Sequence, residues 1–290
     1  MPTGTLPRAA PPGVPGSPEW QEQVAAWGAL LARCCRRPTR GRVHGLRSST
    51  LRLQSQLEFW RECATPAAAT EHTLRRWIRQ AVRLRRWLHT VREADVCLAR
   101  LKRLGKRAQG PGGAEPRLSA ACLRQMKALE RGLERRRRTA AAKLTEKLNA
   151  RHQRLARLGE ALAAVPTQHA CAGTGPAMEK ISARIVAAAA EFPELNAGNL
   201  HAFRCTMRRV HYLAAQLAPV DACGHRLAAT LQRMQTAAGE WHDWQLLAKE
   251  AVRAFPKKAG AGSLAATLES QADASLHKAL SLCGRFLRRF

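Results

Sequence analysis

The sequence predicts an all-α protein. Three observations lead to this prediction: Ala, Leu and Arg dominate the chain, β-branched residues are few, and helix-forming residues fill almost every window. The 290 residues suit one large domain or two smaller ones, and either is long enough to bury a core. Apolar residues make up 46% of the chain, which is too much for a disordered protein.

The first part of the chain is predicted to be a tail followed by a helical half. Residues 1–18 are rich in Pro and Gly, so we expect a disordered tail there. Residues 19–164 form the first half, and their Gly- and Pro-containing stretch 105–119 predicts a flexible loop. Helices of this half are expected near 19–35, 40–63, 67–89, 92–106 and 118–162.

The stretch VPTQHACAGTGPAM, residues 165–178, is predicted to be a linker between two halves. Residues 179–290 form the second half, which is predicted to hold about as many helices as the first. They are expected near 177–191, 197–217, 222–237, 240–254 and 263–287.

The two halves look like diverged copies of one sequence. A His-x-x-Arg motif at His44 recurs at His201, and the spacing is 201 − 44 = 157 residues. A second shared element is VREADVCLARL (91–101), matched by AGEWHDWQLLA (238–248); Asp95 and Asp243 within it are 243 − 95 = 148 residues apart. An internal duplication of this length predicts helical bundles related by a pseudo-two-fold axis.

The charge of the chain predicts an anionic partner. Lys and Arg total 49 against 21 Asp and Glu, which gives a formal net charge of +28. Such an excess repels itself and attracts nucleic acid, another polyphosphate or an anionic membrane. The sequence has no run of about 18 uncharged apolar residues, so we expect no membrane span. The nine cysteines follow no disulfide framework or CxxC pattern, so we expect reduced thiols and a cytoplasmic protein.

The repeated motif places cations on one face of a helix. On a helical wheel of residues 199–217, the basic side chains lie opposite a row of apolar ones. Like charges at this spacing weaken a helix, so we expect an anion to neutralise them. The candidate binding residues of the second copy are His201, Arg204, Arg208, Arg209 and His211, and those of the first copy are His44, Arg47 and Arg52.

Two further basic rows extend this candidate site. The segment 71–89 has one apolar and one cationic face, and the cationic face carries Arg75, Arg76, Arg79, Arg83 and Arg86. In the predicted helix 118–162, cations run beside an apolar line: Arg136, Lys143, Lys147 and Arg154, with Arg137 on the apolar line itself. Arginine side chains bind phosphate oxygens in pairs, and these rows are expected to form a cationic surface between helices.

The motifs resemble those of a known family. VHGLRSSTLRLQSQL and LHAFRCTMRRVHYLAAQL, followed by LHTVREADVCLARL and AGEWHDWQLL, are similar to the paired signatures of CHAD, the conserved histidine α-helical domain. The resemblance covers roughly residues 20–290. It implies two antiparallel four-helix bundles related by a pseudo-two-fold axis, a basic central groove, binding of inorganic polyphosphate and association with polyphosphate granules.

The resemblance also assigns site residues. It carries the family's basic positions to His44, Arg47 and Arg52, and to His201, Arg204, Arg208 and Arg209 of this sequence. The family usually has further basic residues where Leu51 and Gln54 stand, so the first copy departs from the pattern at two positions.

Alternative functions remain at this point. A nucleic-acid binder fits the charge equally well, although aromatic residues amount to only 5% and no zinc finger or convincing helix-turn-helix is found. An enzyme or metal site around Glu240, His242 and Asp243 lacks further ligand pairs, so we expect no catalysis, metal or cofactor. Asp95 and Asp243 are expected to serve as helix-terminal charges or to pair with a neighbouring arginine. A membrane-surface role is disfavoured because the apolar faces are needed for the core.

Overall fold

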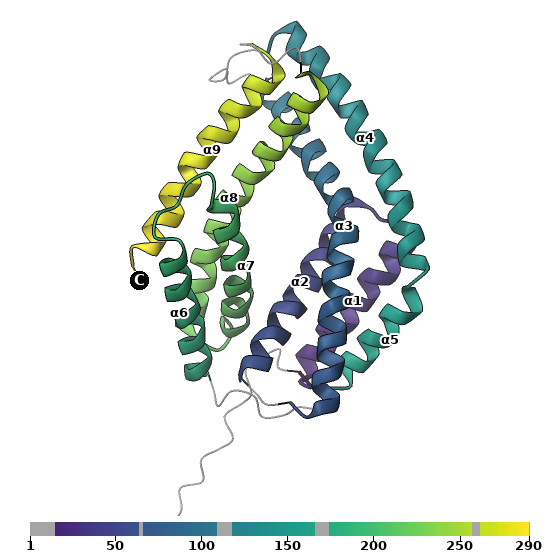
Figure 1. Cartoon of the computed structure of the whole chain (residues 1–290), viewed down its shortest axis with the longest axis vertical. Helices are drawn as coiled ribbons and strands as arrows, with labels where there is room; N and C mark the ends of the chain where they lie inside the picture. The colour runs from purple at the N-terminus through teal and green to yellow at the C-terminus, as the bar shows by residue number, and fades with distance from the viewer. Residues whose placement is uncertain (1–14, 64–65, 109–117, 166–173, 257–261, 290) are drawn as a thin grey trace, which may run out of the picture.

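The computed structural model describes residues 15–63, 66–108, 118–165, 174–256 and 262–289. Every regular element in these ranges is a helix, and they contain no strand, as the sequence predicts (Figure 1). In chain order the helices are α1 (Pro18–Arg36), α2 (Arg40–Cys63), α3 (Ala68–Ala108), α4 (Ala120–Asn149), α5 (His152–Ala163), α6 (Thr174–Glu191), α7 (Leu200–Leu217), α8 (Ala222–Ala254) and α9 (Leu264–Leu287).

Three of the predicted helix boundaries are wrong. The helices expected at 67–89 and 92–106 are one continuous helix, α3, and those expected at 222–237 and 240–254 are the single helix α8. The helix expected at 118–162 is divided, because Arg151 leaves helical geometry between α4 and α5. No Gly or Pro marks this break; it lets Leu155, Leu158 and Leu162 of α5 pack into the first-half core.

The predicted tail and linker lie mainly outside the described residues. Residues 1–14 and 166–173 are not described, and neither are residues 109–117 of the predicted loop. Helix α1 begins at Pro18, where the hydroxyl of Ser17 accepts a hydrogen bond from the backbone N–H of Trp20. This contact is an ordinary helix N-cap. Helix α6 begins at Thr174, inside the stretch that was expected to be linker.

A first core holds the N-terminal half together. It is formed by α1, α2, the first part of α3, the end of α4 and α5. Trp27 packs edge-on against Trp77 with ring centroids 5.8 Å apart, and its indole N–H donates to Thr50 Oγ1 at 2.9 Å. A side chain at Gly159 of α5 would come within 3.0 Å of the Trp27 ring, so glycine allows α5 to approach α1 closely.

A second core is formed by α6, α7, the first part of α8 and the end of α9. Phe192 and Phe203 pack edge-on within it, with ring centroids 5.7 Å apart. Phe203 is one of the apolar residues that the wheel of residues 199–217 places opposite the basic row. The burial of this face turns the basic side of α7 away from the core.

A third core joins the two halves and is called the apical core here. It consists of the ends of α3 and α8 and the beginnings of α4 and α9, with Leu101, Leu133, Leu247 and Leu268 among its buried residues. Figure 1 shows the paired helices α3 and α4 meeting α8 and α9 at the top of the molecule, and α2 facing α7 below. The two halves are therefore in contact at two places, through α2 and α7 and through the apical core.

Candidate functional site

The two copies of the His-x-x-Arg motif meet between the halves of the molecule. Helix α2 carries the first copy, helix α7 carries the second, and these helices pack against each other. The positive charges of each copy act on those of the other, and two arginines of α3 join them. We call this group the central cationic cluster; it consists of His44, Arg47, Arg85, Arg92, Arg204 and Arg208.

Arg47 is held in place by the backbone of α3. Its guanidinium donates a hydrogen bond to the carbonyl oxygen of Arg85 at 2.8 Å. Burial, together with the charges of Arg85, Arg208 and Arg92, lowers the pKa of Arg47 from its ordinary value to about 10. The helix-surface cation of the first motif therefore stands in a crowded, partly dehydrated environment.

Arg204 has the corresponding role in the second motif. Burial and, after it, the charge of Arg208 lower its pKa to about 10. Its guanidinium lies against the backbone of α8 at Gly239, where an added Cβ would be 3.2 Å from Nη2. The Nε atoms of Arg204 and Arg85 are buried and have no hydrogen-bond partner. A buried donor without a partner is unfavourable, and it adds to the cost of assembling this cluster.

Arg208 is at the centre of the electrostatics. Its charge contributes to the lowered pKa of every other member of the cluster, after burial in each case. The side chain of Arg208 makes no hydrogen bond and no ion pair with any described residue. No described carboxylate forms an ion pair with any of the six cations, although Asp243 is near enough to favour the charged form of Arg92.

Histidines lie at one edge of the cluster. The rings of His201 and His242 are 4.4 Å apart between centroids, and His201 Nε2 lies 3.6 Å from the thiol of Cys205. Burial and, after it, the neighbouring charges of His201 and Arg204 lower the pKa of His242 to about 4. A bound anion would favour the charged forms that the arginines now disfavour.

The remaining motif residues lie on α2 and α7 beside the central cationic cluster. Arg52 lies over the ring of Tyr212, with its guanidinium carbon 5.9 Å from the centroid, and close enough to His211 to lower the pKa of that histidine after burial. Arg209 approaches Glu58 at 3.9 Å. Leu51 and Gln54, the two departures from the family pattern, are buried.

The other predicted basic rows do not join the central cluster. Arg75 pairs with Glu71, and Arg76, Arg79, Arg83 and Arg86 are exposed on α3. Arg136 pairs with Glu250 of α8 at 2.7 Å, and Arg137 pairs with Asp95 of α3 at 2.7 Å. Lys143 and Lys147 are exposed on α4. The predicted residues that come together are therefore those of the duplicated motif.

Sequence reasoning missed Arg85 and Arg92. On the wheel of α3 they lie among the apolar side chains and not on the cationic face. The apolar face of α3 is turned toward the rest of the molecule, so these two arginines are too. Their spacing of seven residues, two helical turns, was the available signal. It identifies a shared side of α3 but not the helix packed next to it.

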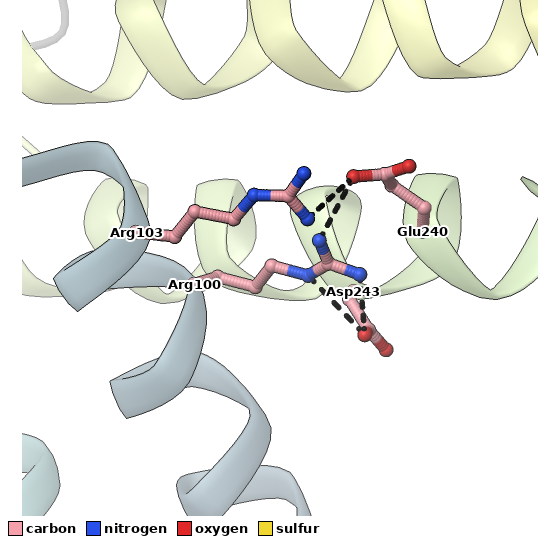
Figure 2. Close-up of polar contacts among 4 residues, drawn as sticks. All are labelled: Arg100, Arg103, Glu240 and Asp243. Atoms are coloured by element: carbon pink, nitrogen blue, oxygen red, sulfur yellow. Dashed lines mark hydrogen bonds and ion pairs between the residues drawn. The ribbon is translucent and has the colours of Figure 1, made fainter. Parts of the chain in front are cut away.

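Acidic residues near the cluster are used to connect helices. Figure 2 shows Arg100 of α3 between Glu240 and Asp243 of α8, with Nη1 3.0 Å from Glu240 Oε1 and Nη2 3.0 Å from Asp243 Oδ2. Arg103 also donates to Glu240, at 3.1 Å. The expectation that Asp95 and Asp243 pair with neighbouring arginines is confirmed by the partners of both.

Within the part of the chain that the structure describes, no group of three His, Cys, Asp or Glu side chains is arranged to hold a metal ion. No described helix has the length and apolar character needed to cross a membrane.

Comparisons with known proteins agree with this architecture. The family model described as the CHAD domain matches residues 19–252. Among solved structures, PptA from Streptomyces chartreusis is similar with a TM-score of 0.63 and 18% sequence identity; the match covers 92% of this chain and 96% of that chain. At this identity the likeness shows the fold alone. A search of curated proteins gave no match.

Proposed function

Since the chain belongs to the CHAD domain family, we propose that it binds inorganic polyphosphate at the central cationic cluster and catalyses no reaction on it. One observation carries this proposal: the two motif copies, distant in sequence, come together as a group of cations that lack carboxylate partners. Such a group is unfavourable by itself, and a polyanion removes the repulsion.

Polyphosphate suits this group better than a ligand with bases. It is a flexible chain with about one charge per phosphate, so its recognition needs closely spaced cations on rigid helices. The guanidinium of Arg208 is half-buried and has no hydrogen bond or ion pair among the described residues, so it can donate paired hydrogen bonds to phosphate oxygens. The large aromatic rings Trp77 and Phe203 are buried, so they offer no stacking platform to a nucleic-acid strand.

The finer parts of the proposal concern shape and place. The cluster would line a basic groove between the halves, and a pseudo-two-fold axis would relate Arg47 to Arg204. Both arginines are partly buried, and burial helps to lower the pKa of each to about 10. This similarity supports such a relation. Binding would bring the protein to polyphosphate granules in the cytoplasm.

The proposed site is tested by removing its cations. Polyphosphate of defined chain lengths is titrated against the wild type and against Arg204→Ala/Arg208→Ala. Each charge-assisted contact contributes about 1.5–3 kcal/mol, so we expect the double variant to bind at least about tenfold more weakly. Helical circular dichroism should be unchanged.

A matched control separates the site from the net charge. Arg124→Ala/Arg131→Ala removes two exposed arginines of α4 and the same amount of charge. This control should bind nearly as tightly as the wild type. Undiminished binding by Arg204→Ala/Arg208→Ala would show that the duplicated motif is not the contact surface.

Two further measurements test ligand class and catalysis. Duplex DNA should fail to displace polyphosphate at equal phosphate concentration; efficient displacement would favour a nucleic-acid-binding function instead. Phosphate release from polyphosphate is followed with metal-free and metal-loaded protein, and turnover in either would overrule the non-catalytic assignment.

A further inference from the structure

A second concave cationic surface lies where α4 breaks and α5 begins. It is a cavity of about 1090 Å³, large enough for several phosphate groups. Its walls come from the end of α1, from α3, and from the α4–α5 junction together with α5. The cavity takes in Arg76, one of the exposed arginines of α3 that the central cluster leaves unused.

The charged side chains of this cavity are all basic. Arg36, Arg76, Arg154 and Arg157 line it together with His152, and no Asp or Glu is among its lining residues. The four arginines are exposed, and none forms an ion pair or hydrogen bond with a described carboxylate. Arginines around a hollow without counter-charge repel one another, and a bound anion relieves this repulsion.

The cationic surface continues from the cavity along α3. Arg83 follows Arg76 by seven residues, so both point to nearly the same side of the helix, about 10 Å apart along its axis. Trp87 follows on the same side, and Arg151 lies over its ring with the guanidinium carbon 5.2 Å from the centroid. We call these arginines the outer cationic face: Arg36, Arg76, Arg83, Arg151, Arg154 and Arg157. Its extended form suits a chain-like anion.

The outer cationic face is separate from the central cationic cluster. Helix α5 packs on α1 and α3, whereas the motif side of α2 is turned toward α7. The first-half core, with Trp27 and the leucines of α2 and α5, lies between the two helices. Figure 1 shows α5 at the outer edge of the molecule and α2 on the inner side facing α7.

We propose that the outer cationic face is a second polyphosphate-binding site, so that one molecule holds two stretches of polyphosphate on opposite sides of its first-half bundle. The inference rests on the proposed function and extends it from binding to bridging. Two chains held by one molecule are linked, and a chain long enough to reach both sites gains affinity through effective concentration.

The stoichiometry of a short chain tests this inference. Inorganic tripolyphosphate is too short to reach both sites, so calorimetric titration should give two equivalents for the wild type. Arg76→Gln/Arg154→Gln/Arg157→Gln should bind one equivalent, and so should Arg204→Ala/Arg208→Ala. A control with the same loss of charge, Arg124→Gln/Arg131→Gln/Arg135→Gln on exposed positions of α4, should keep both.

Bridging is measured separately with two batches of long polyphosphate that carry donor and acceptor fluorophores. The wild type and the α4 control should bring them into energy transfer, and both site variants should lose most of the signal.

One equivalent for the wild type, with the outer variant equal to the control, would overturn the second site but leave the proposed function intact. No binding by the wild type would reject both. A third experiment measures binding to anionic phospholipid vesicles. Binding to the vesicles, without tripolyphosphate binding at the outer cationic face, would also overturn the inference.

Discussion

Arg204 owes its position to a neighbour that has no side chain. Gly239 lies in the middle of α8, and the guanidinium of Arg204 packs so close to it that an added Cβ would be only 3.2 Å from Nη2. The helix continues through this glycine although glycine is a poor helix former. The site thus depends on a residue of the second shared sequence element as well as on the His-x-x-Arg motif.

Gly239→Ala is predicted to weaken binding without loss of stability. The new methyl group pushes the Arg204 side chain away, and the loss of about one charge-assisted hydrogen bond corresponds to about tenfold weaker polyphosphate binding. The free energy of unfolding should stay the same or rise by up to about 1 kcal/mol, because alanine favours the helix. Titration and urea denaturation measure the two effects.

Gly132→Ala is the control for this substitution. Gly132 lies in α4, and a Cβ there meets nothing within 4 Å. It should gain stability by a similar amount and leave polyphosphate binding unchanged. Equal binding by the Gly239 and Gly132 variants would show that Arg204 does not need its observed position.

At the level of single residues, sequence reasoning found the motif but not its whole surroundings. His44, Arg47 and Arg204 were predicted from the recurring motif and Arg208 from the basic row of its helix, and the structure brings them together. Arg85 was missed because a helical wheel contains no information about neighbouring helices. Arg136 and Arg137 were predicted to bind polyphosphate, yet each forms an ion pair with an acidic residue that is distant in sequence. The periodicity of one helix cannot predict such a partner.

Helix α3 connects the parts of the molecule at the level of elements. Its 41 residues span about 60 Å, and it contributes to both the first-half core and the apical core. It also supplies Arg85 and Arg92 to the central cluster and Arg100 to the contact with α8. One rigid element thus fixes the site relative to the junction of the halves.

Arg100→Ala is predicted to destabilise the contact between α3 and α8. The substitution leaves Glu240 and Asp243 partly buried without this partner and removes a guanidinium that lies 5.4 Å from the Trp244 ring centroid. We expect a loss of about 2–4 kcal/mol in the free energy of unfolding, measured by urea denaturation. Arg103→Ala, which removes a half-exposed partner of the same glutamate, should cost less than about 1 kcal/mol. Comparable losses in the two variants would contradict this account.

The lengths of α3 and α8 show where sequence reasoning fails for elements. The boundary near residues 90–91 was placed between two recognised motifs, but no Gly or Pro stands there to end a helix. A break was also expected between residues 237 and 240, but α8 continues through Gly239. The division between α4 and α5 has the opposite origin: tertiary packing of α5 ends a helix that local propensity would continue.

At the scale of the whole molecule, the net charge of +28 is distributed unequally. Acids such as Glu240, Asp243 and Glu250 pair with arginines that connect helices, and the cations left over gather in the central cluster and on the outer face. The same excess that makes the chain repel itself therefore concentrates where a polyanion can contact it.

Polyphosphate binding is predicted to depend steeply on salt. If about six phosphates are neutralised at a site, counter-ion release lowers the affinity by about 10²–10³-fold between 50 and 200 mM salt. Fluorescence titration at several concentrations of sodium chloride gives the slope. The Arg204→Ala/Arg208→Ala variant should have a shallower slope than the α4 control. A change of less than about threefold in wild-type affinity would argue against an electrostatic site.

The apical core has a consequence for the chain while it is being synthesised. Leu101 and Leu133 leave the ribosome long before their partners Leu247 and Leu268, and 268 − 133 = 135 residues must be added in between. At typical rates of translation this takes on the order of ten seconds. During that interval the nascent first half exposes the apolar residues of its part of the apical core, so we expect a chaperone to bind them.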